Sequence, residues 1–170
     1  MGAVMSGFPS VSVVAGRRDP WLHTGDETAL AVYRRLGDWA LRVTDGLSPE
    51  QRETMLQCEH GGMNEVAADL YALTGEAPYL ELARRFNHKA VLDPAARHVD
   101  ALNGLHANTQ FPKFIGAARQ HELGGDDWTV EAARFFWERV VRHHSYGTGG
   151  NSNHEHFGPP DQLNDRLSSE

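Results

Sequence analysis

Two short segments of the sequence combine ionisable side chains with glycines and amides. One holds His106 with Asn108 close behind it, and the other holds Glu155 between His154 and His156. A carboxylate can donate or accept a proton, and an imidazole can bind a sugar hydroxyl, an anion or a metal ion. Protonated neighbouring histidines lower the pKa of a carboxyl group and burial raises it, and the spacing leaves open which effect is larger. The pattern indicates a loop with acid–base or binding chemistry.

A third polar segment runs from Cys58 to Glu65 and includes His60 and Asn64. Asn64 suits a helix cap, but so many polar groups in one turn exceed what capping requires. Cys58 and His60 stand two residues apart, a spacing that rarely brings a cysteine and its general base into contact. We therefore interpret Cys58 as a buried structural residue, and His143-His144 as a favourable charge near a helix C-terminus.

The elements that position these segments follow from an internal repeat. Gly25, Gly75 and Gly125 are separated by 50 residues, and apolar residues at helical spacing flank each glycine. Each copy predicts a helix, a tight turn at glycine and a second helix. The predicted helices cover residues 29–43, 64–73, 79–90, 112–123 and 130–141, with another from the Ser48 N-cap through Cys58.

The apolar stripes of these helices predict the core, and Pro112 is expected in the first turn of its helix. The longer connections 93–105 and 145–170 are predicted to be loops, and no segment after residue 15 alternates as a strand. The sequence thus predicts an all-α fold of helix-pair repeats, either an open array or part of a closed ring. Both segments with His106 and Asn64 precede the helix that leads to a glycine turn, so we expect them on one rim.

Composition excludes several functional classes. The 170 residues carry 16 Lys and Arg against 23 Asp and Glu, a net charge of −7, with no basic stripe for nucleic acid. One cysteine excludes a disulfide framework and a four-thiolate zinc site within the chain. No apolar run is long enough for a membrane span and no signal peptide is recognised, and cellular location stays open. The ten histidines are the unusual feature.

Three motifs in the same order resemble the β-L-arabinofuranosidase group of bacterial glycoside hydrolases, family 127 and its neighbour family 146. The motifs are Cys58-Glu59-His60-Gly61-Gly62-Met63-Asn64-Glu65, Gly104-Leu105-His106-Ala107-Asn108-Thr109-Gln110, and Gly149-Gly150-Asn151-Ser152 with Glu155-His156-Phe157. The resemblance covers about residues 22–170. It implies part of an (α/α)6 toroid and an exo-acting, retaining glycosidase that removes terminal β-L-arabinofuranosyl residues from plant-type arabinose-containing glycans.

The resemblance also implies roles for individual residues. Glu155 matches the general acid/base, His106 matches a histidine that contacts the sugar, and Glu170 matches a glutamate that binds zinc. Further substrate contacts are implied at His60, Asn64, Asn151 and His156. The family nucleophile is a zinc-bound cysteine thiolate, and Cys58 matches neither it nor the zinc cysteines.

We therefore expect a partial catalytic domain over residues 22–170, truncated after Glu170, that has no activity alone and retains no zinc. Residues 1–21 are expected to be a divergent N-terminal segment, in which Pro20 would break or kink a helix at a cost of ~3 kcal/mol. Two other interpretations remain open. One is a non-catalytic helical module that binds carbohydrate or a partner protein. The other is a mononuclear metal protein that uses His154, His156 and either His60 or His106.

Overall fold

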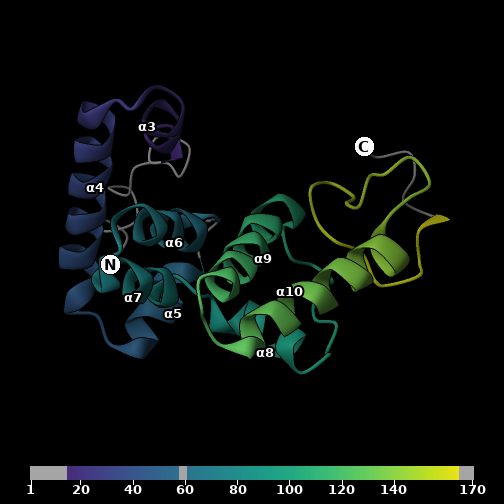
Figure 1. The fold of residues 1–170 in the computed structure, drawn as a ribbon. Coiled ribbons are helices and arrows are strands. Elements are labelled where there is room, and N and C mark those ends of the chain that lie inside the picture. The colour runs from purple at the N-terminus through teal and green to yellow at the C-terminus, as the bar shows by residue number, and fades with distance from the viewer. Residues whose placement is uncertain (1–14, 58–60, 165–170) are drawn as a thin grey trace.

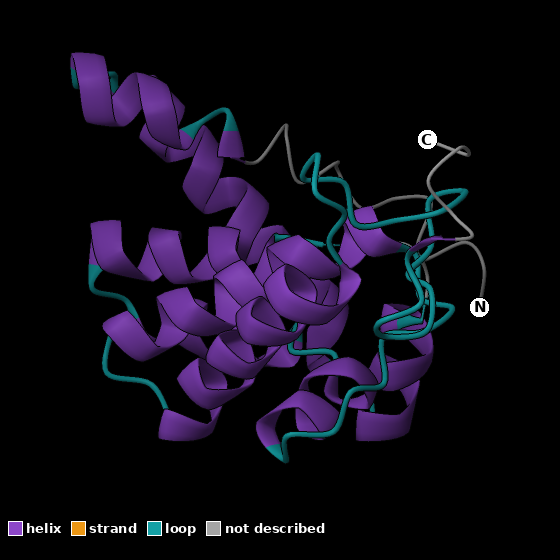
Figure 2. Ribbon diagram, turned by 90° about the vertical axis from the view of Figure 1, so that its right-hand side faces the viewer, coloured by secondary structure: helices purple, strands orange, loops and turns teal. Residues whose placement is uncertain are grey.

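The computed structural model describes residues 15–57 and 61–164, and within them the chain is helical with no strand (Figures 1 and 2). This confirms the predicted all-α fold class. The elements are α3 (Arg18–Thr24), α4 (Glu27–Asp45), α5 (Pro49–Leu56), α6 (Met63–Thr74), α7 (Ala77–Arg85), α8 (Lys89–Ala96), α9 (Ala107–Glu122), α10 (Asp127–Arg139) and the π-helical turn η1 (Val140–His144). None of these helices is long and apolar enough to cross a membrane.

The three predicted glycine turns are present. Gly25 ends α3 with a φ of 69°, and Gly75 ends α6 with a φ of 71°. In the third copy Gly124 takes the left-handed conformation, with a φ of 84°. Gly125 follows it in close contact with the chain, where an added Cβ would lie 2.6 Å from the Gln120 carbonyl oxygen. Glycine is needed at these turns because other residues rarely adopt a positive φ.

The helices pair as the repeat predicts. Helices α6 and α9 lie side by side, α7 packs against α6, and α10 packs against α9 (Figure 1). Helix α4 packs on α6 and α7, and α3 packs on α4. The described residues therefore form packed helix pairs, and closure into a toroid stays a prediction.

The core has two clusters of buried side chains. The first lies between α4, α6 and α7 around Tyr33, Tyr79 and Leu82, each at most 2% exposed. The second lies between α8, α9 and α10, where the rings of Phe114 and Phe136 stack with centroids 3.9 Å apart. Burial of these apolar surfaces is the main stabilising contribution in such a fold. The prediction that the helical stripes form the core is confirmed at these positions.

The predicted helix over residues 79–90 is interrupted. Helix α7 ends at Arg85 and α8 begins at Lys89, so α8 occupies the start of the predicted loop 93–105. The cause is a tertiary contact: the Glu53 carboxylate accepts hydrogen bonds from the backbone N–H groups of Lys89 and Ala90, both at 3.2 Å. These bonds satisfy the free N–H groups at the start of a new helix.

One expectation about proline was wrong. Helix α9 begins at Ala107, so Pro112 lies inside the helix rather than in its first turn. Pro20 was expected to break or kink a helix, and the chain does turn at residues 16–17 before α3 begins at Arg18, which places Pro20 in the first turn of α3. The first N–H groups of a helix have no intrahelical acceptor, so proline loses little there.

The outer face of α10 departs from the prediction that the apolar stripes are core. Trp137 is 69% exposed, so the prediction that it belongs to the core is wrong for this structure, because no described element packs over it. Of the two valines at the next stripe position, Val140 is 4% exposed and belongs to the second core cluster, while Val141 is 48% exposed.

Candidate functional site

The second and third motifs meet through three backbone hydrogen bonds. The Gly104 N–H donates to the Phe157 carbonyl at 2.9 Å, and the Phe157 N–H donates to the Leu105 carbonyl at 2.9 Å. The Ala107 N–H donates to the Glu155 carbonyl at 2.8 Å. We call these two joined segments, residues 104–107 and 153–157, the loop clip. The loop clip brings together residues that are about 50 positions apart in the sequence.

The loop clip sets Glu155 beside His106. The Glu155 Oε2 and the His106 Nε2 are 3.6 Å apart, with His106 15% exposed and the Glu155 side chain 77% exposed. The His156 ring meets the His106 ring edge to face, with centroids 5.3 Å apart. A carboxylate open to solvent next to a sheltered imidazole is an arrangement that can exchange a proton with a bound ligand.

The backbone of this loop adopts an unusual conformation. His154 has a φ of 46° and Glu155 a φ of 66°, both in the left-handed region that side chains other than glycine rarely occupy. Such strain persists where surrounding contacts impose it, and it is concentrated at functional sites. The His156 Nδ1 lies 2.6 Å from the His154 carbonyl oxygen, so it carries the proton of that hydrogen bond.

Phe157 anchors the loop clip in the core. Its side chain is 1% exposed, and its ring contacts Phe111, Phe136 and His144. The π-helical turn at the end of α10 directs His144 inward, where its Nε2 lies 2.9 Å from the Asp100 Oδ2. The structural role predicted for His144 agrees with this position. The sequence did not single out Asp100, which stands in a predicted loop with no motif around it.

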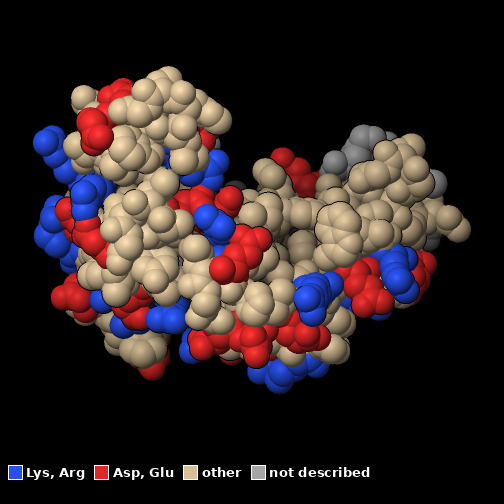
Figure 3. Space-filling model, viewed as in Figure 1, with Lys and Arg blue, Asp and Glu red and all other residues tan. Residues whose placement is uncertain are grey.

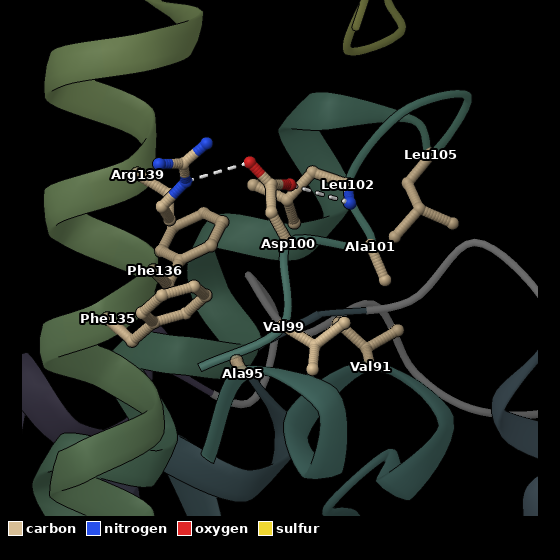
Figure 4. Close-up of a pocket in the computed structure, with 10 residues that line it drawn as sticks. All are labelled: Val91, Ala95, Val99, Asp100, Ala101, Leu102, Leu105, Phe135, Phe136 and Arg139. Atoms are coloured by element: carbon tan, nitrogen blue, oxygen red, sulfur yellow. Dashed lines mark hydrogen bonds and ion pairs between the residues drawn. The ribbon is translucent and has the colours of Figure 1, made fainter. Parts of the chain in front are cut away.

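Asp100 is held in its ionised form. Burial by itself raises the pKa of this carboxyl group, but the hydrogen bonds from His144 and Arg139 outweigh burial and lower the pKa. The Arg139 Nε donates to the Asp100 Oδ2 at 2.9 Å (Figure 4). The adjoining apolar cavity between Val91, Leu105 and Phe136 has a volume of about 10 Å³, roughly that of one water molecule. It is therefore too small for a sugar.

The described part of the first motif, residues 61–65, lies beside α9. Cys58, Glu59 and His60 fall outside the described residues, as does Glu170. Gly61 follows them and lies close to α9, where an added Cβ would be 2.9 Å from the Thr109 carbonyl oxygen. The close contact explains why glycine is needed in this turn.

Asn64 faces the protein interior. It is 1% exposed, and its Nδ2 donates to the Lys113 carbonyl at 2.8 Å and to the Asn87 Oδ1 at 3.3 Å. Gly116 of α9 makes room for this side chain, since a Cβ there would lie 2.2 Å from the Asn64 Oδ1. In this position Asn64 joins α6 to α9 rather than facing solvent. Asn151 is partly buried in the loop before the clip.

Lys113 and His88 are buried beside Glu53, in a cluster of ionisable side chains that no sequence motif predicted. Lys113 is 3% exposed, and its Nζ lies 3.1 Å from the His88 Nδ1. Burial lowers the pKa of Lys113 to about 8. Burial, together with the charge of Lys113, lowers the pKa of His88 to about 4. The Glu53 carboxylate is 3.9 Å from the His88 Nε2.

A zinc site is not formed by the described residues. They contain no group of three or more His, Cys, Asp or Glu side chains that could hold a metal ion. The predicted ligand Glu170, and His60 of the alternative histidine site, lie outside them. Zinc therefore stays a prediction.

The structure is an all-helical domain of packed helix pairs, with a carboxylate and an imidazole 3.6 Å apart on two joined loops. The particular family follows from comparison. A family model described as the catalytic domain of β-L-arabinofuranosidase, GH127, matches residues 11–170, and the chain belongs to this glycoside hydrolase family. The match includes residues 11–21, which were expected to belong to a divergent N-terminal segment. No curated protein matches the chain.

Proposed function

We propose that this chain supplies the acid/base side of a β-L-arabinofuranosidase site, with Glu155 as the proton donor and acceptor and His106 as a sugar contact. The observation that supports this most directly is the 3.6 Å approach of the Glu155 Oε2 to the His106 Nε2 on the loop clip. Family membership supports an arabinose-containing glycan as the ligand.

The finer proposal is a retaining, double-displacement reaction. Glu155 would protonate the leaving glycosidic oxygen and then take a proton from the attacking water. Its exposed carboxylate can meet a ligand from solvent, and the sheltered His106 imidazole can accept or donate a hydrogen bond to a sugar hydroxyl. The cysteine nucleophile, the zinc ion and the rest of the (α/α)6 ring are included in this proposal because the family resemblance implies them.

The test is titration of the purified chain with methyl β-L-arabinofuranoside, followed through the imidazole NMR signals of His106 and His156. We expect saturable shifts, at least tenfold weaker binding in His106→Ala, and preference over the α-anomer. His23→Ala, which removes an exposed histidine of α3, is the control and should bind like the parent chain. Equal binding of both anomers would overturn the proposal.

Turnover separates this proposal from a purely binding role. With an aryl β-L-arabinofuranoside and zinc, we expect no hydrolysis above a Glu155→Gln control, because the only cysteine is Cys58 in the first motif. Hydrolysis by the parent chain above that control would show that these 170 residues need no additional cysteine nucleophile for turnover.

A non-catalytic carbohydrate-binding role is the second candidate, and the 77% exposure of the Glu155 side chain favours it. It predicts that sugar binding survives Glu155→Gln unchanged but is lost in His106→Ala. An acid/base that contacts the glycosidic oxygen predicts a measurable loss in both variants.

A further inference from the structure

A second cavity, with charged side chains in its lining, lies on the face formed by α3, α6 and α9. Its volume is about 290 Å³, and it contains no residue of the loop clip. Its lining combines charged and apolar side chains. The lining residues are Arg18, Leu22, Glu65, Asp69, Ala72, Leu73 and Arg119. Figure 3 shows acidic and basic side chains next to each other over the α6–α9 region, beside a hollow beneath α3.

Asp69 holds the two arginines of the cavity lining in place. Its side chain is 9% exposed and each carboxylate oxygen accepts from a different arginine, Oδ2 from the Arg18 Nη1 and Oδ1 from the Arg119 Nε, the latter at 2.8 Å. The two guanidinium groups are each about one-third exposed. They are fixed by the buried carboxylate and keep further N–H donors for a ligand.

Glu65 supplies a carboxylate that can accept hydrogen bonds from a ligand in the cavity. Among the described residues, its carboxylate makes no hydrogen bond or ion pair that would occupy it, and it stands in the first turn of α6 at the cavity. Burial and the neighbouring charge of Asp69 raise the pKa of Glu65. A neutral ligand with hydroxyl donors would satisfy this carboxylate without adding a charge.

The size and charge of the cavity limit what it can hold. Arg18 and Arg119 are paired with Asp69, and each is also paired with a carboxylate outside the lining, Asp19 and Glu122 respectively. No positive charge is left in excess, so a strongly anionic ligand is not favoured. Leu22, Ala72 and Leu73 line the same cavity, and their apolar surfaces suit the C–H face of a sugar ring. Ligand pockets range from about 300 to 1,000 Å³, so this one suits a single ring rather than an oligosaccharide.

From these contacts we propose that the α3–α6–α9 cavity binds one neutral monosaccharide unit, with Glu65 accepting from a pair of hydroxyls and the Arg18 and Arg119 guanidinium groups donating to ring or hydroxyl oxygens. The site is independent of the proposed acid/base role of Glu155, since a sugar can be held here in a chain that does no chemistry.

The experiment follows the side-chain Nε–H signals of Arg18 and Arg119 in ¹H–¹⁵N NMR spectra of the whole chain. Titration with L-arabinose should shift both signals saturably, with a dissociation constant on the order of 1 mM. Glu65→Ala should weaken binding at least tenfold. Ala72→Phe, which places a ring in the cavity from an exposed helical position, should abolish it.

The matched control is Glu27→Ala, which removes a first-turn carboxylate from α4 outside the cavity and should leave binding unchanged. Three outcomes would overturn the proposal: no saturable shift of the arginine signals, equal binding by Glu65→Ala, or tighter binding of inorganic phosphate than of the sugar. Shifts confined to the His106 and His156 imidazoles would assign the sugar to the loop clip instead. If Ala72→Phe does not fold, the Glu65→Ala result decides.

Discussion

At the scale of single residues, the protein interior contains ionisable side chains that have no part in the proposed reaction. Lys113 and His88 are both buried, and the nearby negative charge that the described residues offer them is that of Glu53. Burying a charged group costs free energy, so each group is driven toward its neutral form. The cluster therefore makes the stability of the fold depend on pH.

His88 should weaken the fold in acid. Its pKa is about 4 in the folded chain against 6.5 when unfolded, so between these values the unfolded chain binds more protons. The free energy of unfolding therefore falls as pH falls from 6.5 to 4. Urea denaturation at pH 6.5 and 4.5 measures the fall, and His88→Gln should reduce it.

The control for this experiment is His23→Gln, which replaces an exposed histidine and should keep the acid dependence of the parent chain. A His88→Gln protein that loses as much stability in acid as the parent would show that His88 does not cause the effect.

At the scale of elements, α6 and α9 approach closely because glycine stands where their surfaces meet. Gly116 leaves space for the Asn64 side chain, whose amide then donates to the Lys113 carbonyl. Gly61 does the same for the Thr109 carbonyl one turn away along α9. The close approach of α6 and α9 therefore depends on the absence of a Cβ at Gly61 and Gly116 as well as on the hydrogen bonds between the helices.

Gly116→Ala should destabilise the chain by about 1–3 kcal/mol or more, because the new Cβ would overlap the Asn64 side chain. Chemical denaturation monitored by circular dichroism measures the change. Gly46→Ala is the matched control, since a Cβ there meets nothing within 4 Å and Gly46 has a φ of −86°. A neutral effect of Gly116→Ala would mean that α6 and α9 do not pack this closely.

At the scale of the whole molecule, the C-terminal loop is joined to the middle of the chain through a buried connection. Asp100 holds His144, the His144 ring packs on Phe157, and Phe157 bonds the backbone of residues 104–105. This connection passes from the loop after α8, through the end of α10, to the proposed acid/base loop. It keeps Glu155 near His106 although the two are distant in the sequence.

Asp100→Asn should loosen the loop clip without unfolding the rest. Loss of the charged acceptor is expected to speed amide hydrogen exchange at Phe157 and Ala107 about tenfold, while Val66 in α6 stays protected. Asp161→Asn, at the exposed pair with His143, is the matched control and should leave the exchange of both amides unchanged. Unaltered exchange in Asp100→Asn would contradict the connection.

Local patterns predicted the helix pairs well, because glycine turns and apolar spacing act over a few residues. The Ser48 capping box at α5 and the turns at Gly25 and Gly75 are confirmed in this way. The break before α8 was missed because it depends on Glu53, more than 30 residues away. The exposure of Trp137 was also missed, since a stripe does not tell which helix will cover it.

Residue types and short-range spacing were enough to predict an acidic, all-helical repeat with a family-type motif around Glu155 and another around His106. Three further features become visible only once the helices are packed: these motifs meet, Asn64 faces inward, and Asp69 joins Arg18 to Arg119 at a polar cavity. The physical reason is that hydrogen bonds and ion pairs between distant segments depend on how whole helices pack, and no local pattern encodes that packing.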